Sequence, residues 1–174
     1  MPIAGSNTVS KAILLSQSYA NIYNLINNKS NVPDPFGSDT RKMVYRRDPL
    51  IKGTSFKGYP CVIINPASIT FEDHGIDGSR ANVGWEVNIE ILCSDTIRNN
   101  NGKGAEWCDE LAESILYTLN DTTNRKTLRS YGMANIVPDI GDVNLIIISQ
   151  ERIFSRTITL KFNKRLEIGW FQLV

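Results

Sequence analysis

Residues 85–93, with the sequence WEVNIEILC, alternate between apolar and polar side chains and constrain the fold more than any other stretch of the chain. Trp85, Val87 and Ile89 lie on one side of this period-two pattern, and Glu86 and the polar residues that follow it lie on the other. Such alternation is typical of a β-strand with one buried face. Another element must therefore cover the apolar face of this strand.

The covering element is predicted from the helical periodicity that follows the strand. Apolar residues recur there at spacings of three and four, as they do along the buried face of a helix. They are Trp107, Cys108, Leu111, Ala112, Ile115, Leu116 and Leu119. The sequence therefore predicts an α+β fold, in which a mainly antiparallel sheet carries helices packed on one face.

Other stretches predict the rest of the sheet and two further helices. Strands are expected at 59–65, 85–94 and 153–162, and the last of these is expected to pair with the strand around Val87, because both are long and alternating. Shorter strands are expected at 43–45, 69–71, 133–137 and 143–148. A first helix, capped by Ser6 or Thr8, is expected to run to about Asn28, and a helical turn is expected at 124–130.

The composition fits one soluble domain spanning residues 1–174. The formal net charge is +1, so no overall field attracts the chain to nucleic acid or to an anionic membrane. No apolar run is long enough to span a bilayer, and the first residues do not resemble a secretory signal. We therefore expect a cytosolic protein without a membrane partner.

Two segments depart from the regular pattern. The segment 29–58 is rich in proline, glycine and basic residues, and is predicted to be a long loop. Its basic residues form either a solvated surface or a docking surface for an acidic partner or DNA, and they are Arg41, Lys42, Arg46, Arg47, Lys52 and Lys57. The tail 166–174 contains Trp170 and Phe171, and is expected to pack against its own domain or against a neighbouring subunit.

No catalytic, cofactor or metal site is predicted. His74 is the only histidine, and no G-x-S-x-G elbow or phosphate-binding loop is present. Asp73, His74 and Asp77 are adjacent enough to approach a cation, but Gly75 and Gly78 explain the same stretch as a tight turn. The three cysteines contain no C-x-x-C pair, and are interpreted as reduced thiols packed in the interior.

The order of these elements resembles that of the tail terminator and tail completion proteins of long-tailed bacteriophages. It runs from a helix and a proline-punctuated loop to a strand at YPCVII, a strand opening W-x-V-x-I-x-I, an amphipathic helix and a closing strand at TITLKF. The resemblance covers roughly residues 6–164, and lies in the architecture and in the spacing of apolar residues rather than in an invariant sequence motif. The segments 29–58 and 166–174 differ from the compact pattern of that family.

The resemblance implies a structural, non-enzymatic virion protein without cofactors, assembled in the host cytoplasm. It implies a ring, hexameric in this family, that terminates the tail tube at the phage neck and joins tail to head. The partners implied are other copies of the chain, the tail tube protein, a head–tail connector or adaptor, and DNA passing through the lumen without sequence-specific binding. A cyclic contact needs two different surfaces on each subunit, which exposed strand edges and the apolar tail could supply.

Three alternatives remain open at the level of sequence. The protein could fill another position at the same junction, as a tail completion, connector or stopper protein. It could be a ligand-binding or hydrolytic α+β domain, which requires a pocket with convergent polar groups. It could be a nucleic-acid-binding module that uses the basic residues between Arg41 and Lys57, with Tyr45 and Phe56 as stacking side chains.

Overall fold

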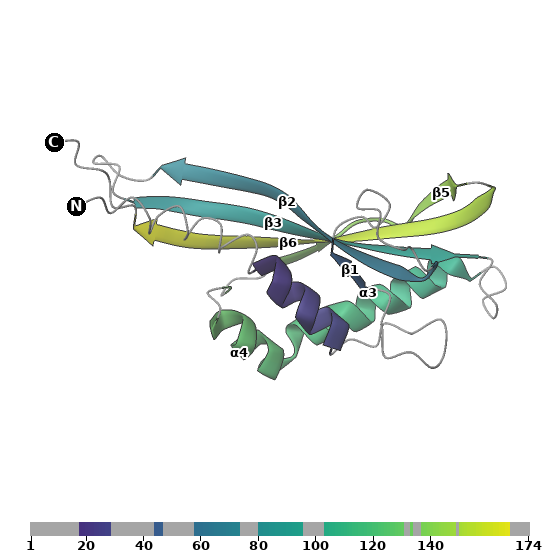
Figure 1. The fold of residues 1–174 in the computed structure, drawn as a ribbon, viewed down its shortest axis with the longest axis horizontal. Helices are drawn as coiled ribbons and strands as arrows, with labels where there is room; N and C mark the ends of the chain where they lie inside the picture. Colours follow the sequence, from purple (N-terminus) through teal and green to yellow (C-terminus); the bar gives the residue numbers. More distant parts are fainter. Residues whose placement is uncertain are drawn as a thin grey trace.

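The computed structural model of the 174-residue chain describes residues 18–28, 44–46, 58–73, 80–95, 103–130, 133, 137–148 and 150–167. These residues form one six-stranded sheet with helices against one of its faces (Figure 1). The strands are β1 (Val44–Arg46), β2 (Cys61–Asp73), β3 (Arg80–Ser94), β4 (Val137–Ile140), β5 (Asn144–Ile148) and β6 (Glu151–Glu167). The helices are the segment 18–28, α3 (Gly104–Asn120) and α4 (Thr122–Ser130). The α+β class predicted from sequence is confirmed.

The sheet is antiparallel except at one edge. Its order is β1-β2-β3-β6-β4, and β1 runs parallel to β2. The long strands β3 and β6 pair along their whole length, with Val87 opposite Leu160, so the predicted partnership of these strands is confirmed. Both β4 and β5 pair with the remaining edge of β6, where β4 lies opposite residues 158–161 and β5 lies opposite residues 151–155.

The strand boundaries differ from prediction in two places. Residues 59–65 and 69–71 were expected as separate strands, whereas β2 continues past Pro66 with a register shift before Ile69. Of the strand expected at 133–137, Met133 lies outside the strands and 134–136 lie outside the described residues, whereas β4 runs from Val137 through Pro138 to Ile140. Proline lacks a backbone N–H, but β4 lies at the edge of the sheet, where proline is tolerated.

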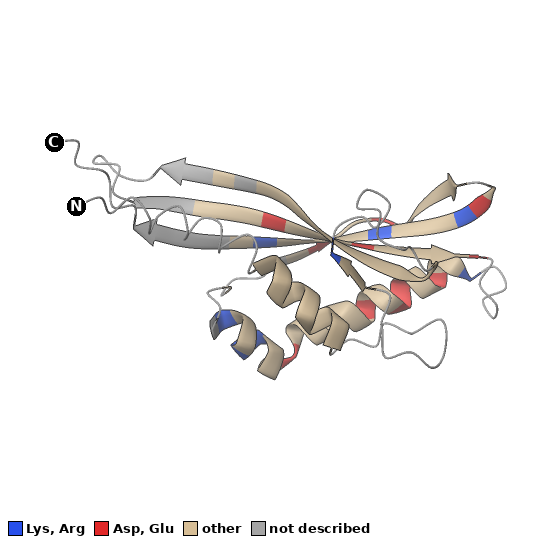
Figure 2. Cartoon of the chain, viewed as in Figure 1, with Lys and Arg blue, Asp and Glu red and all other residues tan. Residues whose placement is uncertain are grey.

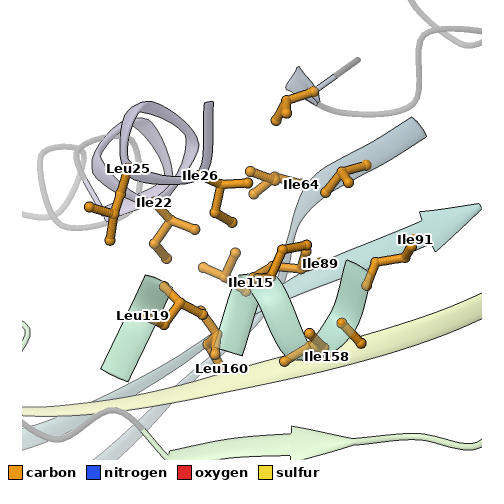
Figure 3. Packing of buried hydrophobic residues seen from close by; sticks show 14 of the residues in the cluster. Ile22, Leu25, Ile26, Ile64, Ile89, Ile91, Ile115, Leu119, Ile158 and Leu160 are labelled. Atoms are coloured by element: carbon orange, nitrogen blue, oxygen red, sulfur yellow. The ribbon is translucent and has the colours of Figure 1, made fainter. Parts of the chain in front are cut away.

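The core lies between the helices and one face of the sheet. Alternate residues of β3, from Val83 to Cys93, are buried there, as the alternating pattern predicts. Figure 3 shows side chains from helices and strands meeting in this layer, with Ile22 from the segment 18–28 and Ile115 from α3 directed toward the sheet. The helices therefore cover one face, and the long strands extend beyond them (Figure 1).

The opposite face of the sheet is more polar. The Ser155 hydroxyl donates to Glu90 Oε1 at 3.3 Å, and the hydroxyl of Thr159 lies 3.0 Å from Asn88 Oδ1. A small second cluster around the buried Cys61 and Ile63 is one apolar part of this face. The polar side chains of β3 therefore form hydrogen bonds across to β6.

Helix α3 is fixed to the sheet at its N-terminal end. The backbone N–H of Gly104 donates to Asp95 Oδ1 at 2.9 Å, which places a carboxylate at the positive end of the helix dipole. One turn further, Asp109 forms an ion pair with Arg156 of β6. These contacts set the position of the amphipathic helix along the two central strands.

Candidate assembly interface

The strand β5 exposes apolar side chains on both faces of the sheet. Its sequence is NLIII, and every residue in it is exposed. The exposed fractions are 49% for Leu145, 38% for Ile146, 69% for Ile147 and 43% for Ile148. Leu145 and Ile147 lie on the helix side, because Leu145 is opposite Phe154, which packs against the main core. Ile146 and Ile148 lie on the other side.

The outer edge of β5 is also uncovered. Within the part of the chain that the structure describes, β5 pairs with β6 alone. Natural edge strands usually carry a lysine, a proline or a bulge that discourages pairing with another chain. The segment Asn144–Ile148 has no charged residue and no proline, and its register against β6 is unbroken. An open apolar edge of this kind is suited to accept another strand.

The opposite edge of the sheet is blunted. β1 pairs with β2 only at residues 62–64, and Pro66 follows at once. Proline offers no N–H to an added strand, and the register shift between Pro66 and Ile69 distorts the strand further. The two edges of the sheet therefore differ, and the edge formed by β5 is the one suited to pair with a strand of another chain.

Charged side chains gather on the helices rather than on β5 (Figure 2). The exposed side of α3 carries Glu106, Glu110 and Glu113, whereas α4 carries Arg125, Lys126 and Arg129. Tyr117, also on α3, is 82% exposed and is the largest exposed aromatic side chain in the described part. The helical layer is thus typical of a solvated surface, in contrast to the uncharged β5.

Only one of the interface residues expected from sequence lies in the described part of the chain. The guanidinium of Arg46, at the end of β1, lies 4.5 Å from the centre of the Tyr23 ring, so it also links β1 to the helical segment 18–28. The other expected residues lie outside the described residues, and they are Arg41, Lys42, Arg47, Lys52, Lys57, Trp170 and Phe171. Their interface role stays a prediction.

The described residues contain three buried thiols but no group of metal ligands. No set of three or more His, Cys, Asp or Glu side chains among them is arranged to hold a metal ion. Cys61, Cys93 and Cys108 form no disulfide with one another and are fully buried. Hydrogen bonding to Cys108 and the loss of hydration on burial hold the pKa of the Cys93 thiol far above its usual range. His74 lies outside the described residues.

Sequence reasoning predicted β5 as a strand but missed its exposure. The available signal was the run Leu145–Ile148, in which four consecutive residues are apolar. Such a run normally indicates a strand buried on both faces. Here it belongs to a strand that lacks a cover on either face within the described residues, which is the pattern expected of a surface that another chain covers.

Comparison with known proteins adds no relative. No protein-family model matches the chain, and no curated protein matches it in sequence. Of the described helices, none is long and apolar enough to cross a membrane. The open edge of β5 is therefore the feature that most directly indicates a function.

Proposed function

We propose that this protein is a structural subunit of the bacteriophage neck, which forms a ring that terminates the tail tube and joins tail to head. The proposal assigns no reaction, cofactor or metal to the chain. It places the protein in the virion after assembly in the host cytoplasm. Its partners are other copies of the chain, the tail tube protein and a head–tail connector or adaptor.

One observation carries the proposal, namely that the edge strand β5 is uncharged and exposes apolar side chains on both faces of the sheet. A ring requires a heterologous contact, in which one surface of a subunit meets a different surface of the next. The sheet has unlike edges, since β5 is open and the β2 edge is interrupted at Pro66. Each subunit can therefore bind one neighbour through its β5 edge and another neighbour through a different surface. Such contacts add subunits in one direction until the ring closes.

The charge of the chain is compatible with DNA passing through the ring. A lumen that gripped phosphates through many Lys and Arg side chains would slow the movement of DNA. The formal net charge is only +1, and the cations of α4 are accompanied by the acidic residues of α3. DNA is therefore proposed as a passing occupant without sequence-specific contacts.

The test is a tube-growth assay with the purified tail tube protein of the same phage. Sub-stoichiometric amounts of this chain should stop elongation and appear as rings at one end of each tube in electron micrographs. Ile147→Lys should abolish both effects, because it places a charge in the exposed apolar edge. Tyr117→Lys is the matched control, since it changes an exposed aromatic residue on α3.

Normal capping by Ile147→Lys would remove β5 from the proposal. Unchanged tube growth at any concentration of the intact chain would contradict the terminator function itself. Loss of capping in both variants would show that the effect is not specific to β5.

A further inference from the structure

We infer that the C-terminal segment 168–174 of one subunit adds as a strand to the open edge of β5 in the next subunit. The inference deepens the proposed function and rests on it, because it requires neighbouring copies of the chain. It names both surfaces of the heterologous contact. One is the edge Asn144–Ile148, and the other is the segment with the sequence IGWFQLV.

The two segments match in their lack of charge. Neither NLIII nor IGWFQLV contains an acidic or basic residue. A charged side chain laid against Leu145 and Ile147 would lose part of its hydration. An uncharged apolar strand avoids that penalty while it covers the exposed side chains.

They also match in having apolar residues at both alternating positions. In an extended strand, successive side chains point to opposite faces of the sheet. Ile168, Trp170 and Val174 would therefore share one face, and Phe171 and Leu173 the other. β5 exposes apolar side chains on both faces in the same way. Cross-strand pairs on both faces would then be apolar, and each such pair stabilises the contact.

The length of β6 excludes β5 of the same subunit as the acceptor. β5 pairs with residues 151–155, at the start of β6, whereas the segment follows Glu167 at the other end (Figure 1). The stretch from Ser155 to Glu167 is extended, so it covers about 40 Å at roughly 3.3 Å per residue. Residues 168–174 reach at most about 25 Å when fully extended. They cannot return to their own β5, so the acceptor is β5 of a second copy.

The direction of this contact agrees with a closed assembly. The donor segment and the acceptor strand lie at opposite ends of β6, so each subunit can donate at one end and accept at the other. Repetition of one such contact gives a ring if the rotation between subunits closes. A pairing of two β5 strands would be isologous, and would stop at a dimer.

Disulfide trapping between two variants tests the inference. One full-length chain carries Ile147→Cys and the other carries Phe171→Cys, and they are mixed and oxidised with copper phenanthroline. The native cysteines do not compete in the folded protein, because Cys61, Cys93 and Cys108 are fully buried. The expected product is a covalent dimer that contains one chain of each kind. Tyr117→Cys mixed with Phe171→Cys is the control and should give no such product.

Sedimentation measurements on the same protein distinguish the inference from the ring proposal. Deletion of residues 168–174, and Ile147→Lys separately, should each raise the concentration at half-dissociation at least tenfold, while circular dichroism stays that of the intact chain. If the deletion leaves association unchanged, or if only 147–147 dimers form, the inference is overturned and the ring proposal stands. If the intact chain stays monomeric alone and with tail tubes, both are overturned.

Discussion

Replacing Gly104 with alanine should destabilise the junction between α3 and the sheet. Gly104 is the first residue of α3 and is buried. A Cβ atom added there would lie 2.6 Å from Cδ2 of Phe154 and 2.8 Å from Oδ1 of Asp95. Both distances are too short for ordinary van der Waals contact, so one or both neighbours must move.

The expected change in the free energy of unfolding is a loss of about 1–3 kcal/mol, which is typical of inserting a methyl group into a packed site. The Phe154 ring packs against the main core, and its movement would disturb that contact. The Asp95 carboxylate accepts the Gly104 N–H, so its displacement would weaken the contact that holds the start of the helix. Alanine favours helix over glycine by up to about 1 kcal/mol, which offsets only part of this loss.

Thermal unfolding followed by circular dichroism measures the effect. The midpoint should fall by roughly 2–4 °C for each kcal/mol lost, as for domains of this size. Gly141→Ala is the matched control, because its added Cβ would meet only the Thr157 carbonyl oxygen at 3.5 Å. Gly104→Ala should cost less in a Phe154→Leu background than in the intact chain. A midpoint equal to that of the Gly141→Ala control would refute the close packing at Gly104.

Three further predictions concern the core, the thiols and the histidine. Ile115→Ala should lower the free energy of unfolding by about 2–5 kcal/mol in denaturant titrations, whereas Glu113→Ala on the exposed side of α3 should change it by less than about 0.5 kcal/mol. Because the pKa of the buried Cys93 thiol is raised, this thiol ionises more readily in the unfolded chain, and its contribution to the free energy of unfolding should fall as the pH rises above about 8.5. Cys93→Val should lessen that fall. An equal fall in the intact chain and in Cys93→Val would contradict this prediction. His74→Ala should assemble and cap tubes normally, and loss of capping with an intact fold would reopen catalysis or metal binding.

The sequence predicted those parts of the fold that depend on local periodicity. The strand through Trp85, the helix through Ile115 and the pairing of the strand 153–162 with the strand around Val87 follow from the periodicity of their apolar residues, whereas the register comes from the structure. The continuation of β2 past Pro66 and of β4 through Pro138 does not follow from that periodicity. Proline usually indicates the end of a strand, but it is tolerated at a sheet edge, where both of these prolines lie.

The candidate interface was less predictable, because it depends on where a strand lies in the sheet. The run Leu145–Ile148 predicts a strand, but its pairing with β6 alone is a tertiary property that periodicity does not encode. The expected basic surface and the aromatic pair Trp170 and Phe171 were identified from composition alone. Of these residues, only Arg46 lies in the described part, where it stacks on Tyr23.

The most direct test of the central claim is the mass of the protein in solution and on tail tubes, measured by sedimentation and by scanning transmission electron microscopy. The proposal predicts a discrete closed oligomer, six copies by the family resemblance, whose mass does not grow further with protein concentration. The same oligomer should be found at the end of each capped tube. A single-chain mass under both conditions, or a series of ever longer assemblies that never closes, would contradict the proposal.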